Sequence, residues 1–404
     1  MRFLYGFLFI STVLITTTIA QSATLSVPSQ YSSLAAAVAA AGNGDTIEIL
    51  AGAYTSGIVA TISQNNLIIR GVNGKASFNA DGIPISNGKA ILVTTGNNIT
   101  IENVAFSNTR VPDRNGAGIR HEGGLLTVRH CSFYDNENGI LTSNQGSSGE
   151  LVVEHSEFNH NGLGSAGYTH NIYVGHIGRF VFRYSSSHHA THGHNIKSRA
   201  AENHILYSTI MDEASGNASY QIDLPNGGLS YIIGNVIHQG ISTENSTMIS
   251  YGAEGGSNPI QEVYLINNTM VNDRPSISYG IRLSGSPSAV VRNNIFDNLS
   301  TAVNGVPTEY DHNFEGSSSG FINRGAFNYH LTASSPARDK GINPGTGRNV
   351  SLVPVKEYVH PLGSADRYQD SALDIGAFEY TPATPPPPGE PGTIVVPSNF
   401  LLLR

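Results

Sequence analysis

Short apolar segments, each followed by polar and small residues, recur along most of the chain. Within each segment apolar and polar residues alternate, which is typical of a short β-strand with one buried face. The segments are NITIENVAF, LTVRHCSF, LVVEHSEF, FVFRYSSS, NHILYSTI, SYIIGNVI, VYLINNTM and AVVRNNIF. One turn position that they share recurs every 27 residues or so, and is held in order by Asn103, His130, His155, Tyr184, Tyr207, Gly234, Asn267 and Asn293. A period of this length predicts a solenoid of stacked coils.

A second short apolar segment follows in every unit and keeps step with the first. Its central residues are Ile119, Ile140, Ile172, Ile196, Ile222, Ile249, Ile281 and Val303. Strands this short cannot bury an apolar side alone, so we expect each strand to pair with its copies on the coils above and below. Asn235, Asn268 and Asn294 occupy equivalent turn positions and predict a ladder of side-chain amides that hydrogen-bond to the turn backbone.

The two ends of the chain differ from the repeats and divide it into three parts. Residues 1–23 combine Arg2, an apolar run and a small-residue end, which predicts a cleaved secretory signal peptide. Residues 24–380 form the predicted solenoid domain, with Leu34–Ala41 as a helix that caps the first coil and residues 327–341 and 371–380 as closing segments. Residues 381–404 are a Pro-rich spacer followed by a short apolar tail.

Three features together resemble a known superfamily: the opening YSSLAAAVAAAGNGDTIEILAGAY, the coils of about 27 residues and the terminal DIGAFEY. They are similar to the right-handed parallel β-helix proteins that include pectate lyases and related polysaccharide-active proteins. The resemblance covers nearly all of residues 25–380. It implies an all-β fold, a right-handed parallel β-helix of about ten coils with an N-terminal helix cap and a C-terminal cap. This fold hosts lyases, hydrolases, epimerases and non-catalytic binders, so it leaves the reaction open.

Composition and charge narrow the class of protein further. The hydrophobic content of 39% excludes wholesale disorder, and a single Cys excludes an intrachain disulfide framework and a Cys-rich zinc site. The net charge of −8 does not favour binding to nucleic acid. After removal of the signal peptide no stretch could cross a membrane. We expect a monomer that is secreted or periplasmic and that could be attached to the cell surface through its C-terminal tail.

Alternation in the second series of strands predicts which side chains face solvent. If each central Ile points inward, the next residue points outward. That outward column comprises Arg120, Leu141, Tyr173, Lys197, Asp223, Ser250 and Arg282. By the same rule the residues before the Ile, which are Asn171, Asn195 and Gln221, also point outward, and Arg199 faces the same way as Lys197. Adjacent coils lie about 4.8 Å apart, so Tyr173, Lys197 and Asp223 would be stacked neighbours.

One stretch of the chain around this column is basic. Residues 160–199 contain no Asp or Glu but hold Arg179, Arg183, Lys197, Arg199 and seven of the fifteen His. A face of this kind suits an anionic polymer, such as a polysaccharide that contains uronic acids. The predicted substrate-binding residues are Arg120, Asn171, Arg183, His192, Asn195, Gln221 and Asp223.

The chemistry that suits such a substrate is β-elimination. An enzyme must neutralise the uronate carboxylate, remove the neighbouring proton and protonate the leaving oxygen. Resemblance to β-helix alginate lyases implies a Lys/Arg pair, with Lys197 as base and Arg199 as acid or neutraliser. Here, however, both lie on one strand rather than on neighbouring coils, and Asp223 would stabilise the protonated amine of Lys197. Tyr173, His170 and His194 are therefore alternative bases, and Ca²⁺ is an open alternative as the neutralising group.

Structural explanations of the same residues also remain open. Lys197 and Asp223 could form a simple ion pair between coils, and His170 and His194 could point inward as core histidines. The cluster of His188, His189, His192 and His194 has the residue types of a metal site, but a polar loop is favoured and no metal ligands are assigned.

The leading hypothesis is a lyase that cleaves an acidic polysaccharide, and two alternatives accompany it. One is a non-catalytic β-helix that binds glycans or serves as a surface structure. The other is a glycoside hydrolase, which needs two carboxylates about 5 to 9.5 Å apart. Among Asp135, Asp212 and Asp223, only Asp223 falls on the outward column.

Overall fold

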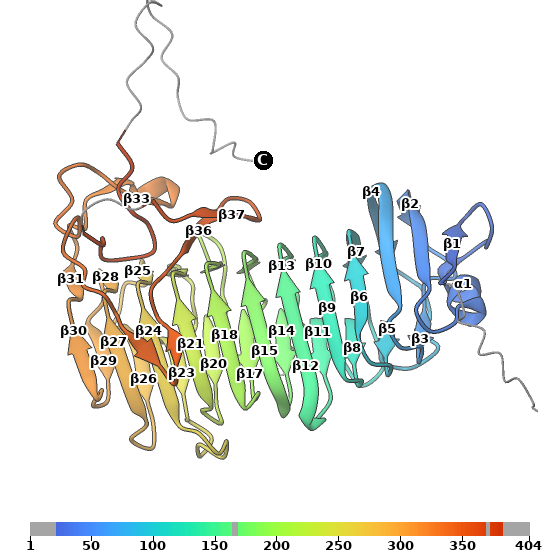
Figure 1. The fold of residues 1–404 in the computed structure, drawn as a ribbon, viewed down its shortest axis with the longest axis horizontal. Coiled ribbons are helices and arrows are strands. Elements are labelled where there is room, and N and C mark those ends of the chain that lie inside the picture. The colour runs from blue at the N-terminus through green and yellow to red at the C-terminus, as the bar shows by residue number, and fades with distance from the viewer. Residues whose placement is uncertain (1–21, 164–168, 369–371, 383–404) are drawn as a thin grey trace, which may run out of the picture.

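The structure is a computed structural model that describes residues 22–163, 169–368 and 372–382. Nearly all of the predicted signal peptide and of the predicted spacer and tail lie outside these residues. The described chain forms a parallel β-helix, as predicted, with strands stacked in three rows along one long axis (Figure 1). Within the described residues, no helix is both long enough and apolar enough to cross a membrane.

One row of strands forms a ten-stranded parallel sheet, which we call the ten-stranded sheet. It has one strand from each of ten coils, and this agrees with the predicted number of coils. Its strands are β3 (Ala60–Ile62), β5 (Ala90–Thr94), β8 (Ala117–His121), β11 (Asn138–Thr142), β14 (Ile172–Val174), β17 (Ile196–Ser198), β20 (Ile222–Leu224), β23 (Thr247–Tyr251), β26 (Tyr279–Leu283) and β29 (Thr301–Asn304).

The other two rows are joined in a 21-stranded sheet because the long strands β2 and β4 belong to both. The first row consists of β1 (Thr24–Val27), β2 (Thr46–Tyr54), β4 (Ile68–Asn79), β6 (Ile99–Glu102), β9 (Leu125–Arg129), β12 (Gly146–Glu154), β15 (Ile177–Arg183), β18 (Glu202–Leu206), β21 (Leu229–Ile233), β24 (Glu262–Ile266), β27 (Ser288–Arg292) and β30 (Glu309–Asp311). The second row continues with β7 (Val104–Ser107), β10 (Ser132–Tyr134), β13 (Glu157–Asn159), β16 (Ser186–His188), β19 (Thr209–Met211), β22 (Val236–Gln239), β25 (Thr269–Asn272), β28 (Ile295–Asp297) and β31 (Phe314–Gly316).

The predicted file of aliphatic side chains fills the inside of the coils. In the ten-stranded sheet Ile172 pairs with Ile196, and Ile196 pairs with Ile222. All three are fully buried. Aromatic rings stack in the same way beneath the second row, where the ring centroids of Phe133 and Phe158 lie 4.6 Å apart. The register of the coils therefore matches the register that the alternation predicts.

The predicted asparagine ladder is also confirmed. The side-chain oxygen of Asn268 accepts hydrogen bonds from the backbone and side-chain amides of Asn235, both at 3.0 Å. Asn268 donates in turn to the side chain of Asn294 (3.0 Å) and to the carbonyl of Ile232 (2.8 Å). All three amides are buried, so the ladder satisfies backbone groups at a corner that water does not reach.

A short helix covers the first coil, as expected. Helix α1 spans Leu34–Ala40, one residue shorter than predicted, and buries Leu34, Ala37 and Val38 against the core. Ser33 precedes the helix as its N-cap, and its hydroxyl accepts a hydrogen bond from the backbone amide of Ala36 at 3.2 Å. This cap explains why the helix begins at Leu34.

The C-terminal segment, residues 320–368 and 372–382, folds back along the side of the coils (Figure 1). It contains three antiparallel pairs and one turn of 3₁₀ helix: β32 (Phe321–Asn323) with β33 (Asn328–Leu331), β34 (Thr346–Gly347) with β35 (Val350–Ser351), β36 (Lys356–Val359) with β37 (Gly363–Asp366), and η1 (Arg324–Ala326).

The C-terminal segment packs on the 21-stranded sheet. The backbone amide of Val355 donates to the hydroxyl of Tyr207, and the hydroxyl of Tyr231 donates to the carbonyl of Gly347. The side chain of Asn267 reaches the carbonyl of Asp374 in the second predicted closing segment. These contacts cover Tyr207, Tyr231 and Asn267, which lie on or directly after strands of the first row of the 21-stranded sheet.

We predict that Asn268→Ala lowers the free energy of unfolding by at least about 3 kcal/mol. It leaves several buried polar groups without partners, each at a cost of about 1 to 3 kcal/mol. Chemical denaturation followed by circular dichroism measures the effect. Asn304→Ala, at a half-buried position on β29, is the matched control and should change stability by less than about 0.5 kcal/mol. Equal effects of the two substitutions would refute the role of the ladder.

Candidate active site

The outward column of the ten-stranded sheet is the starting point of the site. Tyr173 pairs with Lys197 across β14 and β17, and Lys197 pairs with Asp223 across β17 and β20. The same column continues to Leu141 and Arg120 in the opposite direction. The predicted stacking of Tyr173, Lys197 and Asp223 is therefore present, and it follows from the alternation of side chains within each strand.

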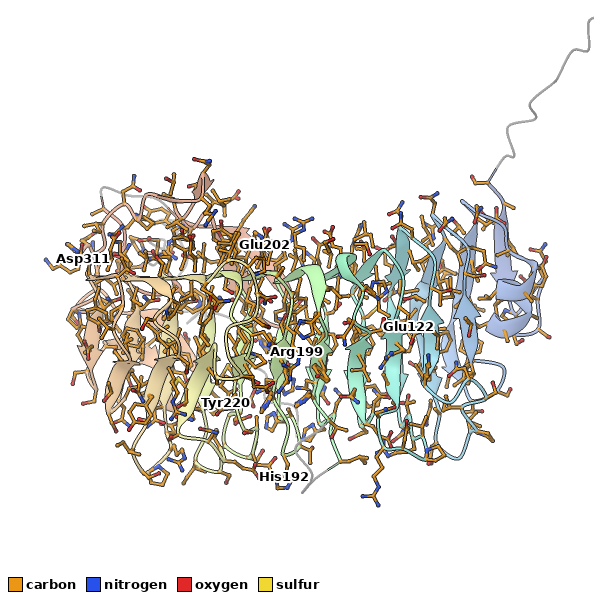
Figure 2. All side chains as sticks on the ribbon, turned by 90° about the horizontal axis from the view of Figure 1, so that it is seen from below. Glu122, His192, Arg199, Glu202, Tyr220 and Asp311 are labelled. Atoms are coloured by element: carbon orange, nitrogen blue, oxygen red, sulfur yellow. The ribbon has the colours of Figure 1, made fainter. Side chains whose placement is uncertain are left out.

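Arg199 joins this column from the end of β17. Its Nε donates a hydrogen bond to the hydroxyl of Tyr173 at 3.1 Å. The guanidinium of Arg199 and the ammonium of Lys197 each lie 5.9 Å from the centroid of the Tyr173 ring, a distance at which a cation interacts with a π face. The predicted convergence of these three side chains is thus observed, and Arg199 lies in the middle of the sheet (Figure 2).

Glu254 completes the cluster and was missed by the sequence analysis. Its carboxylate pairs with Arg199 at 2.7 Å and with Lys197 at 3.4 Å, while Asp223 pairs with Lys197 at 3.1 Å. Glu254 lies in the turn after β23, where the alternation of side chains within a strand no longer predicts their direction. Asp223 is in register with Ser250, four residues before Glu254, so the coil spacing in the sequence does not place Glu254 at this site. We call Tyr173, Lys197, Arg199, Asp223 and Glu254 the cation cluster.

The two carboxylates of the cation cluster have different environments. Burial raises the pKa of Asp223, although Lys197 and Ser250 oppose this shift. The hydrogen bond from Arg199 lowers the pKa of Glu254, and Lys197 adds to the effect. The Asp223 side chain is 5% exposed and that of Glu254 is 49% exposed. Asp223 is therefore an inner anchor for Lys197, whereas Glu254 is an outer partner that can exchange with solvent or ligand.

His170 and His194 lie beneath the cation cluster and are buried. They stack with ring centroids 4.6 Å apart, His170 meets the ring of Tyr173 edge-on, and His194 Nε2 lies 3.6 Å from Asp223. Both are thus buried, as core histidines would be, and their rings contact the side chains of Tyr173 and Asp223 in the outward column. His170 and His194 lie before the first residues of β14 and β17, in a bend where side chains do not alternate strictly between inward and outward directions.

The hydrogen bonds of these two histidines determine where their protons are. Nδ1 of His170 accepts a hydrogen bond from the backbone amide of His194. Nδ1 of His194 likewise accepts one from the backbone amide of Tyr220. Burial lowers the pKa of His170 well below its usual range and lowers that of His194 to about 3. Both rings are neutral near pH 7, with the proton on Nε2, so neither offers a free nitrogen lone pair. Both histidines therefore have their Nδ1 atoms paired, and their role is to position Tyr173 and Asp223.

Asn171, Asn195 and Gln221 do not point outward, and the prediction of their direction is wrong. All three are fully buried. Asn171 donates to the side-chain oxygen of Asn195 at 3.0 Å, and Asn195 donates to that of Gln221 at 2.7 Å. The chain bends just before each strand, which turns these amides into a ladder at the corner. They support the strands of the site and make no surface for a ligand.

Two other predicted binding residues lie away from the cation cluster. Arg183 is on β15 in the 21-stranded sheet, where it pairs with Glu154. His192 pairs with Glu244 in a turn and lies at the edge of the molecule formed by loops (Figure 2). Their placement as part of one basic face is therefore wrong.

The basic window itself is largely neutralised by carboxylates from other coils. Arg179 pairs with Glu150 and Arg183 with Glu154, both one coil earlier, while Glu254 pairs with both Lys197 and Arg199. A run of like charges in the sequence does not form a charged surface when each strand lies beside strands from other coils.

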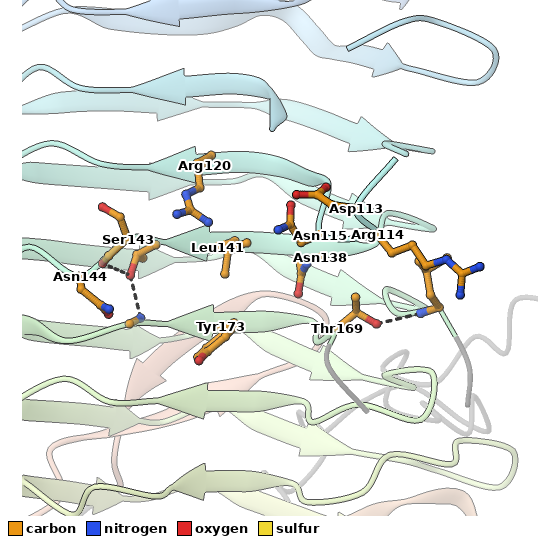
Figure 3. A pocket seen from close by; sticks show the side chains of 13 residues that line it. Asp113, Arg114, Asn115, Arg120, Asn138, Leu141, Ser143, Asn144, Thr169 and Tyr173 are labelled. Carbon is orange, nitrogen blue, oxygen red and sulfur yellow. Dashed lines mark hydrogen bonds between the residues drawn. The ribbon is translucent and has the colours of Figure 1, made fainter. Parts of the chain in front are cut away.

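A pocket of about 650 Å³ adjoins the cation cluster and includes Tyr173 in its wall. Arg120, Leu141 and Tyr173 line its middle from neighbouring strands, with Asn138 and Thr169 on one side of them and Ser143 and Asn144 on the other (Figure 3). Arg120 is held by Glu122 through Nε at 3.1 Å. The pocket gives the phenol of Tyr173 access to a bound molecule, and Arg120 is the predicted binding residue that it does contain.

The carboxylates of this site do not form a calcium cradle. Ca²⁺ needs six to eight oxygen ligands. Asp223 and Glu254 hold the ammonium of Lys197 between them, so a cation already occupies the space that they share.

Comparison with known proteins shows the fold. No family model matches the chain, and no curated protein matches it. Among solved structures, pectate lyase Pel9A is similar with a TM-score of 0.62 and 18% identity, over 90% of this chain and 98% of that one. ORF18 of Geobacillus virus E2 has a TM-score of 0.41 and 15% identity, over 68% of this chain and 54% of that one. The PL6 family alginate lyase AlyGC has a TM-score of 0.33 and 14% identity, over 84% and 59%. The chain thus has the parallel β-helix fold of the pectate lyase.

We predict that His194 makes stability depend on pH. Its folded pKa of about 3 lies below the unfolded value near 6.5, so only the unfolded state gains a proton between these values. This contribution is fully present above about pH 6.5 and is lost as the pH falls toward 3. From pH 7 to pH 5 the native protein should lose about 2 kcal/mol more than His194→Asn, measured by denaturant unfolding. His160→Asn replaces an exposed histidine and should keep the native slope. Parallel profiles for the native protein and His194→Asn would contradict the prediction.

Proposed function

We propose that this protein cleaves an acidic, uronate-containing polysaccharide by β-elimination on the outer face of the ten-stranded sheet. The observation that carries the proposal is the convergence of Tyr173, Lys197 and Arg199 beside an open pocket. These are the residue types that β-elimination requires: a group that can take a proton, and cations that stabilise the charge developing on the carboxylate. The similarity of the fold to a pectate lyase is consistent with this substrate class.

Tyr173 is the proposed base in place of Lys197. The ammonium of Lys197 is held by two carboxylates and is 12% exposed, so it serves as an ion-pair partner in this proposal. The Tyr173 hydroxyl instead accepts a charge-assisted hydrogen bond from Arg199, which stabilises negative charge on the phenolic oxygen. The phenolate takes the proton from the carbon next to the carboxylate, and the resulting phenol returns it to the departing glycosidic oxygen.

Lys197 and Arg199 are the proposed partners of the uronate carboxylate. Lys197 already pairs with Asp223, and Arg199 already pairs with Glu254. Of these two carboxylates, that of Glu254 is the more exposed. An incoming uronate can therefore take the place of Glu254, while Asp223 continues to hold Lys197. In this scheme Glu254 occupies the carboxylate subsite until substrate arrives, and His170 and His194 position Tyr173 and Asp223 from below.

A glycoside hydrolase is the second candidate, and the pair of Asp223 and Glu254 favours it. Lys197 Nζ lies 3.1 Å from one carboxylate and 3.4 Å from the other, so the two nearest oxygens are at most about 6.5 Å apart. Their pKa values are shifted in opposite directions, as expected of a general acid and its ionised partner. Asp223 would be the acid and Glu254 the nucleophile or base. A non-catalytic glycan-binding protein would use the same face without turnover.

We also propose that the protein acts outside the cytoplasm, in the periplasm or beyond the cell. This rests on the signal-like residues 1–23 and on the size of a polysaccharide substrate. Attachment to the cell surface through the C-terminal tail belongs to the same proposal.

The first experiment measures product chemistry on alginate, pectate and glycosaminoglycans. The lyase forms an unsaturated uronate, which is followed by ultraviolet absorbance. Tyr173→Phe should lower kcat by about 10²-fold or more, because it removes the group that carries the proton. Tyr279→Phe, on β26 of the same sheet, should stay within about threefold of the native rate. New reducing ends without ultraviolet absorbance would identify the hydrolase, and binding without either product would identify the non-catalytic protein.

The second experiment is Glu254→Gln, because the two enzyme mechanisms predict opposite results. In the lyase, removing this charge frees Lys197 and Arg199 for substrate, so KM should fall about threefold or more while kcat changes little. In the hydrolase, Glu254 is a reacting carboxylate and kcat should fall by several orders of magnitude. Glu244→Gln, in the distant turn that holds His192, is the control and should leave both constants unchanged. A large loss of kcat in Glu254→Gln would refute the proposed lyase roles.

A further inference from the structure

A second cluster of polar side chains lies on the second row of the 21-stranded sheet, on another face from Tyr173 and Lys197. His188 ends β16, His189 follows it in the turn, and Glu213 lies in the turn after β19. One ligand atom from each of these three residues lies within 4.8 Å of the others, and all three are half-buried. His192 and His194, from the same stretch of sequence, are held elsewhere by Glu244 and Asp223.

The backbone brings these residues together. His189 adopts a left-handed conformation with φ of 52°, and Glu213 does so with φ of 50°. In β16 and β19, His188 is in register with Met211, two residues before Glu213. The turns of adjacent coils therefore stack, and they direct an imidazole of one coil and a carboxylate of the next to the same point.

The hydrogen bonds around the two imidazoles leave a pair of nitrogens facing each other. Nε2 of His188 lies 3.2 Å from the carboxylate of Glu157, which can only accept when ionised, so this nitrogen carries the proton and Nδ1 has a free lone pair. Nε2 of His189 lies 3.1 Å from the hydroxyl of Ser215, and the two Nδ1 atoms lie 2.8 Å apart. At this distance one of the two Nδ1 atoms carries a hydrogen, and since Nδ1 of His188 has the lone pair, that hydrogen is on Nδ1 of His189. A metal ion bound by both nitrogens would replace this hydrogen and lie beside the line that joins them.

Exchange of that proton for a metal ion requires little rearrangement. The Ser215 hydroxyl can donate or accept, so His189 can move its proton from Nδ1 to Nε2 and keep its hydrogen bond to Ser215. Both Nδ1 lone pairs then converge. Glu157 behind His188 is the carboxylate partner that orients metal-binding histidines.

We propose that His188, His189 and Glu213 bind one divalent transition-metal ion, with Zn²⁺ as the chemical type. Two imidazole nitrogens and one carboxylate oxygen suit Zn²⁺, with water as a fourth ligand, and do not suit Ca²⁺ or Mg²⁺. The three ligands come from the coils of β16 and β19, and Glu157 on β13 supports His188, so the ion would tie two adjacent coils together. The proposal is independent of the reaction at Tyr173.

The test measures Zn²⁺ binding to untagged, chelator-treated full-length protein by isothermal titration. We expect one ion per chain, a higher melting temperature, and visible absorption when Co²⁺ is the probe. His189→Asn and Glu213→Gln should each weaken binding by about tenfold or more. Asn is a suitable replacement for His189 because Asn108, at the corresponding turn position of another coil, adopts the same left-handed conformation.

His160→Asn is the matched control. His160 also adopts a left-handed conformation and stacks on His189 with centroids 5.0 Å apart, but it is outside the three-residue group. This variant should bind Zn²⁺ within about threefold of the native protein. Absence of saturable binding, unchanged binding in both His189→Asn and Glu213→Gln, or an equal loss in His160→Asn would overturn the proposal. Circular dichroism of each variant excludes unfolding as the cause of a loss.

Discussion

Parallel pairing of each strand with its copies on the neighbouring coils is the constraint on which the rest of this structure depends. It places residues that are one coil apart in the sequence about 4.8 Å apart in space. Inside the coils this produces files of Ile and Phe that bury one another. Outside, it places Tyr173, Lys197 and Asp223 side by side. The core and the candidate site are thus two results of one register, and a one-residue slip would destroy both.

The same register controls the electrostatics. Neighbouring coils supply opposite charges: Arg183 meets Glu154, and Lys197 meets Asp223. In the proposed lyase a substrate carboxylate would therefore meet cations that already have partners. Its binding would rest on displacement of an internal carboxylate, and Glu254, which is 49% exposed, is the residue suited to that exchange. Attraction by a bare positive face is not needed.

Turns between strands carry much of the polar chemistry of this protein. At some corners the amides of Asn171, Asn195 and Gln221 bond to one another, and at others histidines stack. Equivalent turn positions of adjacent coils stack on one another, so the side chains there decide whether a corner receives a structural amide ladder or a group of metal ligands. Both the support of the candidate active site and the proposed zinc site arise from this property of a solenoid.

The sequence by itself determined the solenoid, the number of coils, the inward file of Ile and the order of the outward column, because strand alternation and a repeat of about 27 residues are local patterns. It also placed Tyr173, Lys197 and Arg199 together. It did not determine the directions of His170, Asn171 and Asn195, because these precede a bend where alternation ends. Nor did it identify Glu254 or the pairing of the basic window, since turns differ in length between coils. Only the tertiary structure decides which turn residue reaches which strand, and that choice sets the charge and the chemistry of the site.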